Sequence, residues 1–246
     1  MRDILFGLRF LGRSPGLAVF AILTLALGIG ANTAVFSVVN AVLLRSFGYA
    51  DPARLVQISG TNKQGQPAGV SIYDMTAFQQ RAHSLQRIGT SRVQSFTLIG
   101  AREPENLFGQ MVSPDCFKAL DARPLVGRTF DDADFQSGAP PVAVVSHQVW
   151  QSSLDADPNV VGRRVLLNGA EHTIVGVMPP HFQFPHPAFR VWTPWRLGAE
   201  DLANHSVHNN TLVARLKPGV SREAAAAELK SLSAALAAEF PNTNTG

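Results

Sequence analysis

The stretch from Ser14 to Leu44 contains no charged residue, and it constrains this chain more than any other feature. The apolar run from Leu17 to Leu44 would form a helix about 42 Å long at ~1.5 Å per residue, whereas the hydrocarbon core of a bilayer needs only about 20 residues. Three arginines lie within the first 13 residues and only Arg45 closely follows the run, which favours a cytoplasmic N-terminus. The sequence predicts a transmembrane helix and the start of a stalk over residues 14–44, with all later residues outside the cytoplasm.

A cleaved signal peptide is the competing interpretation, because a basic start and an apolar run are also typical of secretory leaders. Asn32 interrupts the strongest apolar stretch, as a leader would allow. However, no A-x-A pair marks a cleavage site there, and hydrophobicity resumes from Ala34 to Leu44. We therefore favour an uncleaved anchor in the inner (plasma) membrane.

Two features of the predicted span bear on whether it packs against other helices in the membrane. Ala26, Gly30 and Ala34 form a ridge of small side chains, which would let a second helix approach closely. Asn32 lies in the same span, and an amide in lipid is costly unless it finds a partner. Small residues are common in membrane spans in any case, but together with Asn32 they predict a helix that packs against other transmembrane helices.

Residues 1–13 predict a short amphipathic helix in front of the span. Its apolar face carries Ile4, Leu5, Leu8 and Leu11, and its arginines fall on the opposite face. Such a helix lies along the cytoplasmic surface in contact with membrane lipid. Its role is either simple anchoring or docking onto a cytoplasmic partner.

Composition excludes several classes of function for the 246 residues. A single cysteine rules out an intramolecular disulfide framework and a Cys-rich zinc site. The formal net charge of +3 is not clustered in the body of the chain, so we predict no nucleic-acid partner. No G-x-x-x-x-G-K-[ST] sequence occurs, so the chain holds no phosphate-binding loop of an ATPase. We expect no cofactor and no enzymatic activity.

Residues 45–246 predict a mixed α+β domain without repeats. The expected strands are Leu55–Ser59, Ser95–Ile99, Asn106–Val112, Val142–Val145, the hairpin Arg164–Met178 around Asn168-Gly169, and Thr211–Leu216. The expected helices begin after Ser71 with an apolar stripe reaching Leu85, span Pro114–Leu120, follow Ser146, and follow Ser221 up to Pro241. Residues 123–128 read as a turn and connector. This pattern favours a ferredoxin-like unit plus a second small subdomain.

Groups that could carry chemistry have simpler interpretations. His181, His186, His205 and His208 lack the further ligands that a zinc site needs, so we interpret them as surface residues. Ser146 beside His147 lacks a nucleophile elbow and is better explained as a helix N-cap. The aspartates at positions 131, 132 and 134 lack the glycine and glutamate of a calcium loop. We therefore predict no catalytic and no metal-binding residue.

The segment Pro179–Trp195 is rich in proline and aromatic residues. Its rings could form a surface that binds a partner or an apolar ligand, or they could cover the edge of the domain's own core, which is commoner. We favour the core and keep the partner surface as an alternative; its candidate residues are Phe182, Phe184, Phe189, Trp192 and Trp195. Cys116 is interpreted as a small buried hydrophobic residue.

Several blocks of this sequence resemble one family of membrane proteins, in the expected order. They are TLALGIGANTAVFSVVNAVLLRSFGYADPARLVQI (24–58), GQMVSPDCFKALDARPLVGRTF (109–130), PPVAVVSHQVW (140–150), VVGRRVLLNGAEHTIVGVMPP (160–180) and ARLKPGVSREAAAAEL (214–229). The chain resembles the N-terminal part of permeases of the MacB/FtsX type of ABC transporter. The resemblance is closest to a branch of long-chain, often duplicated permeases.

The resemblance implies a role in mechanotransmission or efflux. Such permeases pair with a cytoplasmic ABC ATPase, a separate chain, whose ATP-driven dimerisation moves the transmembrane helices and the periplasmic domain together. The family's amphipathic helix would correspond to residues 2–13, its stalk to the helix leaving the membrane near Val38–Leu44, and its periplasmic core to about residues 50–240. A second permease copy or further transmembrane helices would be the partners in the membrane.

The sequence departs from that family in one large respect. Family members carry at least three further membrane helices, and this sequence stops at Gly246, where a second span should approach. We interpret the chain as a truncated member, the N-terminal part of a permease subunit. A stand-alone, membrane-anchored periplasmic binding module is the main alternative, and a secreted hydrolase using His205, His208 or Ser146 is a third hypothesis.

Overall fold

The computed structural model describes residues 51–61, 64, 66–99 and 103–241, together with Tyr49 and the isolated positions 16, 23, 24 and 26. Residues 47–246 form a compact unit of their own. The predicted amphipathic helix lies outside the described residues, and so does the predicted span apart from those four positions. Among the residues that are described, no helix is both long and apolar enough to cross a bilayer.

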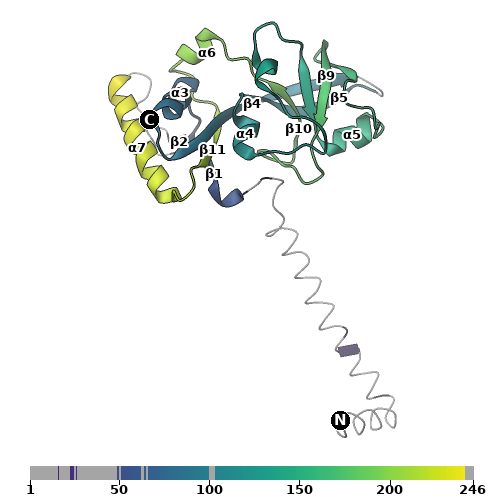
Figure 1. Cartoon of the computed structure of the whole chain (residues 1–246), viewed down its shortest axis with the longest axis horizontal. Helices are drawn as coiled ribbons and strands as arrows, with labels where there is room; N and C mark the ends of the chain where they lie inside the picture. Colours follow the sequence, from purple (N-terminus) through teal and green to yellow (C-terminus); the bar gives the residue numbers. More distant parts are fainter. Residues whose placement is uncertain are drawn as a thin grey trace. The chain divides into compact units, whose positions relative to one another are not determined.

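One end of the domain, which we call the helical lobe, is a three-stranded sheet covered by two helices (Figure 1). Its strands β1 (Leu55–Ile58), β11 (Thr211–Leu216) and the first half of β4 (Leu85–Ile99) lie in the order β1-β11-β4, with both pairings antiparallel. β1 and β4 are therefore parallel, and α3 (Ile72–Arg81) connects them. α7 (Arg222–Glu239) follows β11 and packs against α3. This is the split β-α-β arrangement that a ferredoxin-like unit contains.

The other end, which we call the barrel lobe, is a ring of six strands. The second half of β4 pairs in turn with β5 (Glu105–Val112), β10 (Phe189–Pro194), β7 (Val142–Val145), β9 (Ala170–Val177) and β8 (Arg164–Leu167), and β8 pairs back onto β4. Closing a sheet on itself removes the unpaired edges that an open sheet would expose.

Short elements complete the described part of the chain. They are the 3-10 helices Pro52–Arg54 and Asp132–Phe135, the strands β2 (Gly60–Thr61), β3 (Pro67–Ala68) and β6 (Val126–Gly127), and the helices α4 (Cys116–Leu120), α5 (His147–Ser153) and α6 (Ala199–Ala203).

Three clusters of buried apolar side chains form the core of the domain. The first fills the barrel, where all six strands contribute and Val149 and Leu154 of the α5 segment add to it. The second lies between the sheet of the helical lobe and the helices α3 and α7. The third lies under α4, outside the barrel, and contains most of the aromatic rings.

Local sequence signals account for most element boundaries. Ser71, Ser146 and Ser221 each accept a hydrogen bond from the third backbone N–H beyond them, so all three predicted N-caps are confirmed. Asn168 and Gly169 both have positive φ, as a type I′ hairpin turn requires. The mixed α+β class is confirmed, and the second subdomain is the six-stranded barrel.

Three predicted boundaries are wrong. The helix after Ser71 ends at Arg81, and Leu85 already begins β4, ten residues earlier than the strand expected at Ser95. The chain leaves the helix there because the carboxylate of Glu228 accepts hydrogen bonds from the backbone N–H groups of His83 and Ser84. The connector at 123–128 contains β6, which pairs with β9. The strand β10 lies inside the aromatic segment Pro179–Trp195, where no strand was expected.

Candidate functional site

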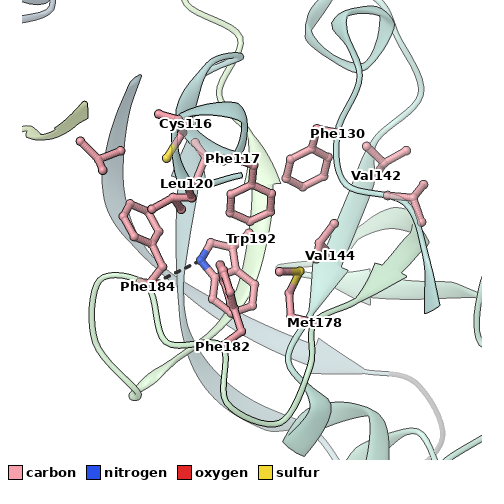
Figure 2. Packing of buried hydrophobic residues seen from close by; sticks show 14 residues of the cluster. Cys116, Phe117, Leu120, Phe130, Val142, Val144, Met178, Phe182, Phe184 and Trp192 are labelled. Atoms are coloured by element: carbon pink, nitrogen blue, oxygen red, sulfur yellow. Dashed lines mark hydrogen bonds between the residues drawn. The ribbon is translucent and has the colours of Figure 1, made fainter. Parts of the chain in front are cut away.

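The aromatic segment is part of the core and not a binding surface. Phe182, Phe184, Trp192 and Trp195 are buried, and Phe189 is partly buried against the cluster under α4. Figure 2 shows Trp192 at the centre of this cluster, with Phe117 and Phe182 around it and its indole Nε1–H donating to the carbonyl of Phe184 at 3.3 Å. The alternative of an exposed partner surface is therefore wrong: three rings face α4 and the barrel wall, and Trp195 packs in the helical lobe.

The first described residue of the domain is fixed to the same cluster. The ring of Tyr49 meets that of Phe182 edge to face, with centroids 5.8 Å apart. Its hydroxyl donates a hydrogen bond to the backbone carbonyl of Gln183. Burial, and then the nearby Cys116, raises the pKa of Tyr49, so this phenol stays a neutral donor. Burial likewise raises the pKa of the Cys116 thiol, which confirms that this cysteine acts as a small hydrophobic residue.

The two lobes share one strand, and Ser91 is the residue where they meet. Within β4, Leu85–Ser91 pairs with β11 of the helical lobe, and Ser91–Leu98 pairs with β5 of the barrel. Ser91 itself has a partner on both sides, Thr211 on β11 and Val112 on β5. β4 pairs with a neighbouring strand from Leu85 to Ile99, and it runs from one lobe into the other as one strand (Figure 1). No flexible linker therefore separates the lobes at this point.

Further bonds reinforce this junction. The backbone N–H of Thr90 donates to the hydroxyl of Ser113 at 2.9 Å, and the N–H of Ser113 donates to the carbonyl of Thr90 at 2.9 Å. The buried guanidinium of Arg215 on β11 donates from Nε to the carbonyl of Ala119 in α4 at 2.8 Å. Gly89 allows α4 to approach, because a Cβ there would lie 2.4 Å from the backbone of Cys116. α4 therefore joins both lobes on one side of the shared strand.

A groove lies beside β1, along the edge of the sheet in the helical lobe. It has a volume of about 1090 Å³ and runs along residues 55–61, with α7 as its other wall. Apolar side chains such as Val56, Ile58 and Leu229 line it, and the charged Arg222 and Lys230 lie on the α7 side. His208 and Asp74 reach its edge, with Nε2 and Oδ2 3.5 Å apart.

The histidines do not form a metal site in the described residues, where no group of three possible ligands converges. His205 and His208 are half-buried, so their interpretation as surface residues is wrong. The ring of His205 lies between Tyr73 of α3 and Phe240 at the end of α7, with centroids 3.8 and 4.1 Å away. The loop that carries it therefore ties the two helices together.

Two of the aspartates in this segment, Asp131 and Asp134, form ion pairs with Arg128. Asp131 caps the 3-10 helix, and the guanidinium of Arg128 donates to both carboxylate oxygens of Asp134, at 2.6 and 3.1 Å. Burial alone would raise the pKa of Asp134, but hydrogen bonds from Arg128 and the Asp131 amide, with the charges of Arg128 and Arg196, hold that pKa below its usual range. Arginine side chains of the same domain thus neutralise these carboxylates, so we interpret the aspartate cluster as structural.

Comparison with solved structures identifies the fold. The periplasmic region of MacB from Actinobacillus actinomycetemcomitans has a TM-score of 0.57 at 15% identity, covering 82% of this chain and 90% of that chain. A domain of a protein assigned as a permease from Porphyromonas gingivalis scores 0.58 at 17% identity, covering 80% and 87%. The extracellular domain of the ABC-type transporter YknZ from Gram-positive bacteria scores 0.56 at 14% identity, covering 78% and 97%.

The fold is thus that of the extracytoplasmic domains of ABC-type transporters. A family model described as the MacB-like periplasmic core domain matches residues 18–232. The chain belongs to this family of MacB-like periplasmic core domains. Comparison with curated proteins gives no match.

The junction at Ser91 is the feature that sequence reasoning missed. The signal was weak, because Arg87, Arg92 and Gln94 interrupt the apolar pattern where the strand passes between the lobes. A strand that changes partners also changes which of its faces is buried, so it shows no single alternation.

Proposed function

We propose that this chain is the N-terminal part of an ABC-type permease subunit, whose periplasmic domain couples ATP hydrolysis in the cytoplasm to work outside it. Membership of the MacB-like family supports the proposal that the chain is part of a permease. The observation that carries the coupling is the strand β4, which belongs to both lobes and has a pairing partner on each side at Ser91. Packed protein interiors have low compressibility and transmit displacement, so a push on one lobe would move the other.

In this proposal the cytoplasmic ABC ATPase is a separate chain. It would act on the amphipathic helix of residues 1–13 and, through the membrane span, on the first residues of the domain. Tyr49 would receive this motion, because its ring and hydroxyl are held by Phe182 and Gln183. A second copy of the permease, and further transmembrane helices, would complete the transporter in the membrane.

The docking of the ATPase is tested by charging the apolar face of the first helix. Leu5→Asp combined with Leu8→Asp should weaken co-purification of the membrane-embedded chain with ABC ATPases of the same genome by at least about tenfold, since burying each leucine is worth about 1.5–3 kcal/mol. Arg9→Gln, on the opposite face, is the matched control and should retain the ATPase. Equal recovery with all three proteins would show that this helix only anchors the chain.

The binding-module alternative has lost its proposed contact surface. It relied on exposed rings between Pro179 and Trp195, and four of the five candidate rings are buried. Substituting Trp192 would therefore test the stability of the domain and not the capture of a ligand.

A further inference from the structure

The chain enters the sheet of the helical lobe through a tight turn, residues 51–54, which we call the entry turn. It consists of Asp51 and the 3-10 helix Pro52–Arg54, and β1 follows it directly. Asp51 has a left-handed backbone, with a φ of 47°. Residues other than glycine seldom adopt this conformation, and they keep it only where their surroundings fix it. The contacts of the entry turn therefore determine its position.

Two of these contacts stay within the helical lobe. The guanidinium of Arg54 donates to the carbonyl of Leu216 in β11 at 3.1 Å. The guanidinium of Arg222, at the start of α7, donates to the carbonyl of Ala53 at 3.3 Å. Because β11 and α7 belong to the same lobe as β1, these two contacts fix the entry turn to that lobe alone.

A third contact, made by Arg215 of β11, also reaches α4. Nη1 of Arg215 donates to the carbonyl of Asp51 at 3.3 Å, and Nε of the same guanidinium donates to the carbonyl of Ala119 at 2.8 Å. The carbonyls in the last turn of a helix have no partner within the helix, and a cation is favourable there. One planar group thus joins the entry turn to α4, the helix that contacts both lobes.

The guanidinium of Arg215 is buried without a described counter-ion. Only 5% of the residue is exposed, and its Nη2 has no hydrogen-bond partner among the described residues. In the same part of the chain no carboxylate forms an ion pair with it, since the carboxylate of Asp51 pairs with Arg54 at 2.6 Å. Burying a cation without an anion is costly, and an apolar residue would fill the position at lower cost. Packing alone therefore does not explain this arginine.

We propose that Arg215 is a positioning residue that fixes the entry turn relative to α4, so that a displacement of the entering chain reaches both lobes. A guanidinium has its donors in fixed directions in one plane, whereas a lysine ammonium is a point charge on a flexible stem. Two carbonyls bonded to one guanidinium therefore keep a fixed separation. The role in coupling rests on the proposed function, but the link from the entry turn to α4 can be tested without an ATPase.

Amide hydrogen exchange of the whole 246-residue chain in detergent tests this link as a double-mutant cycle. Arg54→Gln loosens the entry turn, because it removes the ion pair and the bond to β11. The amides of Asp121 and Ala122 report on α4, since both donate to carbonyls of that helix. Arg54→Gln should speed their exchange at least about threefold in the native chain, the scale of coupling between residues that share partners. In a chain with Arg215→Lys it should leave their exchange unchanged.

Arg222→Gln is the matched control. It also removes an arginine bonded to a carbonyl of the entry turn at 3.3 Å, but that arginine belongs to α7. In a chain with Arg222→Gln, the change Arg54→Gln should still speed the exchange of the two α4 amides about threefold. If the effect is lost there as well, the link is not specific to Arg215 and the proposal fails.

A competing route would pass through Tyr49, whose ring contacts Phe182 in the cluster under α4. If Arg54→Gln speeds the α4 amides equally with and without Arg215→Lys, the aromatic route transmits the change and the proposal is overturned. No response of α4 in the native chain would overturn it too. Either result would leave coupling through β4 standing, whereas lobes that move against each other during ATP hydrolysis would contradict the proposed function alone.

Arg215→Gln provides a second background in case the lysine variant does not fold. Its amide is neutral, so it needs no counter-ion, and its side chain is too short to bond both carbonyls. Melting curves identify the chains that fold. A purely structural role would lower the melting temperature with Arg215→Gln but keep the response of α4 to Arg54→Gln. If neither variant folds, Arg215 serves the fold itself and the proposal fails.

Discussion

Replacing Trp192 by alanine is expected to lower the free energy of unfolding of the domain by about 4 kcal/mol, the usual cost of removing a buried large aromatic side chain. The side chain of Trp192 is fully buried. Its ring contacts those of Phe117 and Phe182, with centroids 6.0 and 5.3 Å away, so its loss opens a cavity in the cluster under α4. Denaturant unfolding of the whole chain, followed by circular dichroism, measures the effect.

Phe108→Ala is the control for this prediction. Phe108 lies in β5, next in the sheet to the strand that carries Trp192, but is 59% exposed. Substitutions at such surface positions usually change stability by no more than about 0.5 kcal/mol. If Trp192→Ala unfolds at the same denaturant concentration as the parent chain, the aromatic segment would be a surface after all.

Replacing Ser91 by proline is expected to break the junction between the lobes. Proline donates no hydrogen bond and is excluded from strands with neighbours on both sides, and Ser91 has such neighbours in Thr211 and Val112. We expect a loss of at least about 2 kcal/mol in the free energy of unfolding, from one lost ladder bond and a buried group left unpaired. In the assembled transporter, ATP hydrolysis should continue while the extracytoplasmic work that it drives stops.

Ser91→Ala isolates the backbone from the side chain. The hydroxyl oxygen of Ser91 is buried and has no hydrogen-bond partner among the described residues, so its removal should leave both stability and coupling unchanged. Melting curves and the ratio of work to ATP hydrolysed are compared for the two variants. Coupling that survives in a folded Ser91→Pro protein would mean that the shared strand does not transmit the motion.

Local signals in the sequence were sufficient for the helix caps and the hairpin, because each depends on a few adjacent residues. Ser71, Ser146 and Ser221 bond within their own first turns, and Asn168-Gly169 sets its own backbone angles. Features formed by distant residues were missed. The early end of α3 depends on Glu228, more than 140 residues away in sequence, and the closure of the barrel depends on two residue pairs between β8 and β4.

The same difference between local and long-range features applies to the candidate site. Burial of the segment around Trp192 was the favoured interpretation because large apolar rings are usually inside, and the structure confirms it. The groove beside β1 could not be predicted, since it depends on which strand lies at the end of the sheet. The roles assigned to Leu5, Leu8, Gly30 and Asn32 remain predictions, because those residues lie outside the described part of the chain.

Distances between spin labels, measured with and without ATP in the assembled transporter, test the central claim most directly. Gln148 of the barrel lobe and Ala235 of the helical lobe are exposed and suit replacement by cysteine, while the native Cys116 is buried and stays unlabelled. The account predicts an unchanged distance between the two positions within one chain, and a changed distance between the Ala235→Cys positions of two permease copies. A distance within one chain that changes, or two copies that do not move while ATP is hydrolysed, would contradict it.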